Sequence, residues 1–341
     1  MSDFPQGNRE LYTPGPKPPE YSELVNTTFT LVKNHRALWW AGMLAVILQG
    51  GANINVNYSM RQPTPTMRPD GTVDFGQMFA GTIIEDIIAN PMPYIVGTLL
   101  LVLLGLLIRL IFGTWAEAAL ILMGHEAAVQ GQTALGRGWR QARQRLGPLI
   151  GFQFLLALPF LVVGGAFFAI LFPFWLSMMK VLTLPPEQIE PAMAAMQPPQ
   201  FPALFCLIPP LICLMVPLAF VMLIINVYGF RSCLLAETGA VASIGRGWQL
   251  FRRALGNTIL TGVFAFIANA VVGLLILVPM IPFGLNFANE FFSTGFSAAM
   301  FWRLLPLMLY MAIASVALGG IVRAYFATLW TKVYEVAALS R

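Results

Sequence analysis

Residues 135–149 read LGRGWRQARQRLGPL, and residues 244–258 read IGRGWQLFRRALGNT. The tetrad Gly-Arg-Gly-Trp therefore occurs twice, 109 positions apart, each time followed by basic residues, a Leu-Gly pair and an apolar run. Self-similarity at a fixed period is the sequence signature of a repeated structural unit. The chain is thus expected to contain internal repeats of about 110 residues.

Both tetrads are predicted to lie on amphipathic helices. Apolar residues recur in each copy at positions i, i+4, i+7 and i+11, which places them on one face of a helix. A basic helix of this kind lies in the headgroup layer of a membrane, where a tryptophan anchors it. The two stripes are Leu135, Trp139, Ala142 and Leu146, and Ile244, Trp248, Phe251 and Leu255. The opposite faces carry Arg137, Arg140, Arg143 and Arg145, and Arg246, Arg252 and Arg253, which are predicted to bind anionic lipid headgroups.

A third, fainter copy begins near residue 21. Val25, Phe29 and Val32 take the same spacing, and Phe29 precedes Trp139 by 110 residues, so the period is kept. Phe29 is accordingly predicted to be a third interfacial anchor beside Trp139 and Trp248. The repeats are expected at about 21–130, 131–240 and 241–341, in one membrane domain, after a disordered cytoplasmic tail over residues 1–20.

The composition excludes a water-soluble globule. Of the 341 residues, 57% are hydrophobic and 10% are charged, whereas a soluble domain has about 25% charged residues. A membrane-spanning helix needs about 20 apolar residues. We therefore predict an all-α membrane protein with six spans, at 37–56, 92–121, 148–179, 203–229, 257–283 and 304–329.

The distribution of Lys and Arg predicts the orientation. The segments 1–36, 122–147, 230–256 and 330–341 hold four, four, four and two of them, whereas the opposite loops together hold four. Because basic residues gather on the cytoplasmic side, both termini are expected in the cytoplasm and the protein in the cell membrane. A short interfacial helix with Glu85 and Asp86 is expected on the outer side, over residues 79–88.

Two arginines fall inside predicted spans. Arg109 and Arg323 recur in matched surroundings, with Phe112 and Thr114 repeated as Phe326 and Thr328. Counted at about 1.5 Å per residue, both lie near the inner ends of their spans, where a long side chain reaches water or a lipid phosphate. Both are interpreted as anchors of the inner boundary, with a transport site as the alternative.

A basic interfacial helix with an aromatic anchor, followed by a helical hairpin and repeated into six spans, resembles the membrane domain of glycerophosphoryl diester phosphodiesterases and its stand-alone bacterial relatives. The resemblance covers nearly the whole chain after residue 20. In those enzymes the chemistry belongs to a separate soluble barrel, and no soluble stretch here exceeds about 40 residues. The resemblance therefore implies a fold and no catalytic residue.

No catalytic or metal-binding motif is found. His125-Glu126 begins like a metalloprotease helix, but Val129 stands where a second histidine is required, so His125 is expected at the surface. The cysteines Cys206, Cys213 and Cys233 are expected to be packing residues. No cofactor, metal or nucleic acid is expected.

Three functions compete. The first is a non-enzymatic scaffold or partner-binding module that interacts with anionic membrane lipids. The second is a transporter or channel for a lipid or amphiphile, favoured by the repeats and by proline-broken spans, and disfavoured by an expected lack of carboxylates within the spans. The third is an intramembrane enzyme using Glu85 and Asp86, whose adjacent positions point them about 100° apart on a helix. They are ranked in this order.

Overall fold

The computed structural model describes residues 20–49, 91–182, 200–283 and 298–339, which are helical with no β-strand among them. The predicted all-α class is thereby confirmed. The predicted tail and the predicted outer helix with Glu85 and Asp86 lie outside the described residues.

Three times along the chain, a short helix is followed by an apolar helix after a single intervening residue. The first pair is α1 (Tyr21–Asn34) and α2 (Arg36–Leu48). The second is α7 (Leu135–Gln144) and α8 (Leu146–Leu182), and the third is α11 (Ala240–Arg253) and α12 (Leu255–Leu277). The two Gly-Arg-Gly-Trp tetrads fall in α7 and α11.

Each pair is followed by a further apolar segment. After α2 comes α5 (Pro91–Ile108), which continues through the π-helical turn η2 (Arg109–Gly113) into α6 (Thr114–Gln130). After α8 comes α10 (Gln200–Leu235). After α12 and the 3-10 turn η3 (Val278–Met280) comes α14 (Ala298–Leu339).

Five helices of the described ranges are long and apolar enough to cross a membrane: Met92–Gln130, Leu146–Ala169, Pro209–Leu235, Leu255–Phe283 and Leu305–Leu339. The chain is therefore a multi-pass membrane protein. The predicted first span corresponds to α2, whose 13 residues measure about 20 Å, short of the ~30 Å of a bilayer core. The rest of that predicted span, residues 50–56, is outside the described ranges.

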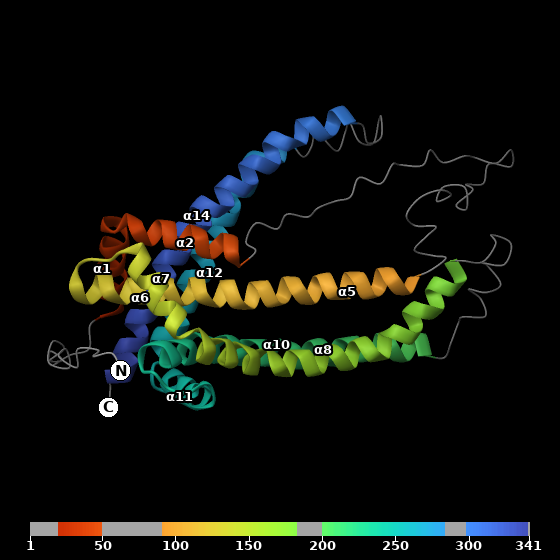
Figure 1. Cartoon of the computed structure of the whole chain (residues 1–341), viewed down its shortest axis with the longest axis horizontal. Helices are drawn as coiled ribbons and strands as arrows, with labels where there is room; N and C mark the ends of the chain where they lie inside the picture. The colour runs from red at the N-terminus through yellow and green to blue at the C-terminus, as the bar shows by residue number, and fades with distance from the viewer. Residues whose placement is uncertain (1–19, 50–90, 183–199, 284–297, 340–341) are drawn as a thin grey trace.

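The helices pack together at one end and separate toward the other (Figure 1). The packed end, as we call it, contains α1, α7 and α11, the start of the described chain and the end of α14. Three buried clusters hold this end together, and α6, α10 and α14 contribute to them. Away from it, α5 runs with nearly every side chain exposed. Because such a surface is apolar all round, it suits surrounding lipid.

Glycines permit the closest helix crossings at the packed end. A Cβ atom added at Gly42 of α2 would collide with the backbone carbonyl of Gly320 on α14. A Cβ atom added at Gly247 of α11 would lie 2.8 Å from the backbone nitrogen of Gly229 on α10. Small residues at such crossings let helix backbones approach, which is how membrane helices gain packing.

Two helices continue past the predicted inner ends of their spans. The second predicted span ends at residue 121, but α6 continues to Gln130. The sixth ends at residue 329, but α14 continues to Leu339. The extra turns belong to the packed end, where Glu126 and Thr331 are buried and His125, Lys332 and Glu335 are partly buried.

Candidate functional site

Helix α7 packs its first anchor residue partly into the protein. Gly138 and Ala142 are buried, and Trp139 is half-buried. The indole of Trp139 meets that of Trp115 on α6 edge-on, with ring centroids 4.8 Å apart. The indole N–H of Trp115 donates to the carbonyl of Trp139 at 3.0 Å. Trp139 thus contacts α6, a neighbour that helical spacing within α7 does not reveal.

Helix α11 packs Ile244 and Phe251 of its expected stripe partly into the protein, but its most buried positions are others. The buried residues are Ser243, Gly247 and Leu250, one position before the expected stripe. Trp248 is 39% exposed, and the centroids of its ring and the ring of Phe251 lie 5.5 Å apart. Phe29 on α1 is 58% exposed. Of the three expected anchors, Phe29 and Trp248 therefore point outward.

The seven arginines of the two tetrad helices fall into two groups. Arg137 pairs with Glu126 of α6, and Arg145 pairs with Glu237, which follows α10. The other five are exposed, and no carboxylate among the residues that the structure describes lies within ion-pair distance of them. These five, which we call the exposed arginines, are Arg140, Arg143, Arg246, Arg252 and Arg253.

The matched span arginines have different surroundings. Arg323 of α14 pairs with Glu117 of α6 at 3.4 Å, and both side chains are about one-third exposed. The side-chain amide of Gln49 donates to Glu117 at 3.1 Å and to the carbonyl of Gly113, in the π-helical turn, at 3.3 Å. Arg109 begins that turn and is exposed.

Glu117 corrects one expectation. The spans were expected to hold no carboxylate, but Glu117 lies within the apolar helix Met92–Gln130. A carboxylate in such surroundings is costly unless it is paired, and Arg323 supplies the pair from a helix more than 200 positions away in sequence. The expected lack of carboxylates within the spans, which was the argument against transport, is therefore wrong at Glu117.

Arg231 of α10 is buried, which its position near a basic loop did not indicate. Its guanidinium donates to the carbonyls of Val227 and Ala327 at 2.8 and 3.1 Å, and to the hydroxyl of Thr331 at 3.3 Å. Two of these partners lie on α14. Arg231 thus links α10 to α14 by hydrogen bonds, and because its guanidinium is buried it does not face lipid.

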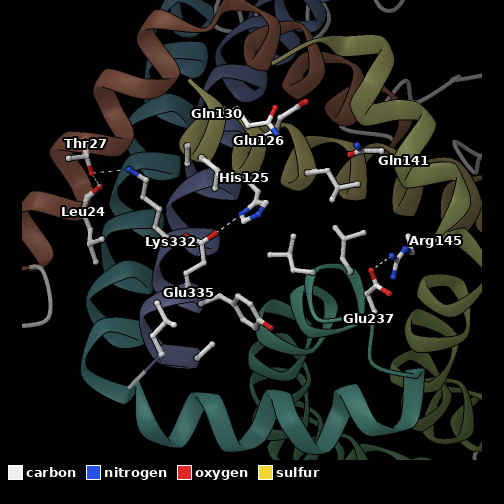
Figure 2. Close-up of a pocket in the computed structure, with 18 of the residues that line it drawn as sticks. Leu24, Thr27, His125, Glu126, Gln130, Gln141, Arg145, Glu237, Lys332 and Glu335 are labelled. Atoms are coloured by element: carbon white, nitrogen blue, oxygen red, sulfur yellow. Dashed lines mark hydrogen bonds and ion pairs between the residues drawn. The ribbon is translucent and has the colours of Figure 1, made fainter. Parts of the chain in front are cut away.

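A cavity of about 850 Å³ opens among the extra turns at the packed end (Figure 2). His125 of α6 lines it with a side chain that is 40% exposed, as expected for a surface residue, and its Nδ1 lies 2.7 Å from a carboxylate oxygen of Glu335 on α14. Lys332 lines it from α14 and donates to the hydroxyl of Thr27 on α1 at 2.9 Å. The volume falls within the range of small-molecule sites.

Neither a metal centre nor a known relative directs the interpretation. Among residues 20–49, 91–182, 200–283 and 298–339, no group of three or more His, Cys, Asp or Glu side chains could hold a metal ion. Comparison with protein-family models, curated proteins and solved structures finds no match. The functional inference therefore depends on the geometry alone.

Proposed function

We propose that the protein is a non-enzymatic cell-membrane scaffold that binds anionic lipid headgroups through its tetrad helices. The observation that carries this proposal is the set of exposed arginines, which have no described carboxylate partner, together with the exposed ring of Trp248. On α11, Arg252 follows Trp248 by one helical turn, so ring and guanidinium share a face. An indole in the headgroup layer would hold that guanidinium at phosphate depth.

Arg137 and Arg145 are left out of this proposal. Their carboxylate partners, Glu126 and Glu237, already neutralise them, so they are expected to hold α6, α7 and α10 together. The predicted headgroup set of seven is thereby reduced to five. This division supplies an internal control, since Arg137 and Arg145 are close in sequence to the exposed arginines Arg140 and Arg143 of α7.

Replacing Arg140, Arg143, Arg252 and Arg253 together with glutamine should reduce retention of anionic lipid at least about tenfold, because each basic residue near an anionic surface contributes about 1 kcal/mol. The protein would be purified in mild detergent, and the phosphatidylglycerol that co-purifies would be measured by mass spectrometry. Raised salt should weaken retention in the unchanged protein, since exposed charges are screened.

The matched control is the double variant Arg137→Gln and Arg145→Gln. It should lose thermal stability while keeping its bound anionic lipid. The competing explanation is that the exposed arginines serve only the positive-inside rule during insertion. Unchanged lipid retention in a correctly inserted four-site variant would favour that explanation and refute ours.

We also propose six spans with both termini in the cytoplasm. The start of α1 and the end of α14 lie at the same end of the bundle, which an even number of crossings requires (Figure 1). Besides the five long helices, the remaining span would be the first predicted one, residues 37–56, which includes α2. Asp70→Cys and Glu190→Cys, in a background without native cysteines, should be labelled from outside without permeabilisation. Labelling only after permeabilisation would reverse the orientation.

The threefold order of short helix, apolar helix and returning apolar helix supports the proposed internal repeats. Thr28, Gly138 and Gly247 each precede an expected anchor residue by one position, and all three are buried. An arrangement of three such units is the one implied by the resemblance to the membrane domain of glycerophosphoryl diester phosphodiesterases. We propose that this chain is a stand-alone relative of that domain.

A second candidate function is transport of a small amphiphile, which the Glu117–Arg323 pair favours. Charged groups inside a membrane bundle commonly mark a substrate or ion pathway. The two functions predict that different compounds stabilise the purified protein. A soluble compound that raises the unfolding temperature of a lipid-free sample would favour transport, whereas stability that depends on anionic lipid would favour the scaffold.

A further inference from the structure

The cavity at the packed end differs in charge from the rest of the protein. Lys and Arg outnumber Glu in the described ranges, which hold six carboxylate residues. Four of the six line the cavity, and they are Glu23, Glu126, Glu237 and Glu335. The described Lys and Arg residues that line it are Arg145 and Lys332. Most of the described carboxylates of a basic protein thus lie around one cavity.

Glu126 gives a second, independent indication of a missing partner. The residue is 7% exposed, and Arg137 binds only one of its two carboxylate oxygens. The other oxygen, Oε2, is buried without a hydrogen-bond partner among the described residues. A buried carboxylate oxygen requires a donor. An N–H group of a ligand would satisfy it.

Glu237 lines the cavity in a strained backbone conformation. Its φ is 55°, and it is the one residue other than glycine with positive φ in the part of the chain that the structure describes. The connection after α6 places a glycine, Gly131, in the same region at φ 67°. A glutamate is more strained than a glycine in this conformation. Strain of this kind gathers at binding sites.

From these features we infer that the cavity binds an aliphatic diamine or polyamine. The carboxylates come from α1, α6, α14 and the connection after α10, and Figure 2 shows Glu335 and Glu237 on opposite sides of the hollow. Leu24, Leu234 and Leu235 also line it. An ammonium group supplies three N–H donors and a positive charge. Two ammonium groups joined by a hydrocarbon chain match separated carboxylates in a cavity that is also lined by leucine side chains.

The test is calorimetric titration of the full chain, purified in neutral detergent without added lipid, with putrescine and with spermidine. We expect saturable binding of both amines. We expect no binding of 1,4-butanediol, which has a similar shape but no charge, and none of choline, a cation without N–H donors. Lipid is absent, so failure here would leave the headgroup proposal untouched, and loss of lipid retention would leave this one untouched.

Two variants and one control locate the site. Glu126→Gln keeps the shape and the acceptor for Arg137, but it places an N–H donor or neutral oxygen where a charged acceptor stood. Glu237→Gly removes a carboxylate at a position whose backbone favours glycine, so it should fold even if Glu126→Gln does not. Each should weaken amine binding at least about tenfold, the usual effect of losing one charge-assisted hydrogen bond. Glu20→Gln, outside the cavity, should leave binding unchanged.

Absence of saturable binding by the unchanged protein would overturn the inference. So would an equal loss in Glu20→Gln and Glu237→Gly, because the amines would then be responding to overall charge. Binding that survives Glu237→Gly unchanged would also overturn it, since that variant removes one carboxylate of the proposed site.

Discussion

Replacing Gly247 with alanine should lower the stability of the protein by about 2–3 kcal/mol, the usual cost of forcing an extra methyl group into a packed contact. The added Cβ would lie 2.8 Å from the backbone nitrogen of Gly229 and 3.2 Å from the carbonyl of Ile225. These atoms belong to the backbone of α10, so no side chain can move aside. Helix α11 would have to shift as a unit.

Gly245→Ala is the matched control within the same tetrad. Nothing lies within 4 Å of a Cβ atom there, and alanine favours a helix interior over glycine by up to about 1 kcal/mol. The control should therefore be neutral or stabilising. The midpoint of thermal unfolding in detergent, followed by circular dichroism, compares the two. Equal midpoints would mean that α10 and α11 do not cross closely at Gly247.

The first tetrad should respond more weakly. A Cβ atom at Gly138 would lie 2.4 Å from the Cγ of Met123, a side-chain atom that can shift, and 3.3 Å from the carbonyl oxygen of Ala119. We expect Gly138→Ala to cost about 1 kcal/mol, the lower end for overpacking. The two identical Gly-Arg-Gly-Trp tetrads should therefore differ in how well they tolerate alanine at the second glycine, because a different helix packs against each.

The sequence was sufficient for the helical class and for the membrane spans of the described ranges, since both depend on composition and local periodicity. It also placed both tetrads on helices. It did not show which way each stripe faces. Trp139 and Trp248 occupy matched positions in the two tetrads. Trp139 packs against Trp115 of α6, whereas Trp248 is exposed, because the adjoining helices α6 and α10 carry different residues.

The cavity could not be predicted for a related reason. Its carboxylates are scattered between residues 23 and 335, with no local spacing that indicates a site. They meet only because α6 and α14 continue beyond the predicted ends of their spans. His125 shows the same limit: its side chain is partly exposed, as expected, but its partner Glu335 lies 210 positions away on α14, where no local pattern indicates it.

Arg323→Leu should destabilise the protein by about 2–3 kcal/mol, below the range for a fully buried pair because both side chains are partly exposed. The reason is that Glu117 would lose its cation while remaining in an apolar helix. The matched variant Arg109→Leu should change stability by less than about 0.5 kcal/mol, as is usual for an exposed residue without a partner. Thermal unfolding in detergent compares them. Equal losses would restore the interpretation of both arginines as simple boundary anchors.

A double-mutant cycle isolates the pair itself. Glu117→Leu alone should also be costly, whereas Glu117→Leu combined with Arg323→Leu should recover most of the loss, because no unpaired charge then remains. Arg323→Lys should keep most of the stability, since the guanidinium makes one contact with Glu117, at 3.4 Å, and an ammonium can replace it. Additive losses in the double variant would show that Glu117 and Arg323 act independently. In that case the hydrogen bond from Gln49 would be the main partner of the carboxylate, and Gln49→Leu should then cost as much as Arg323→Leu.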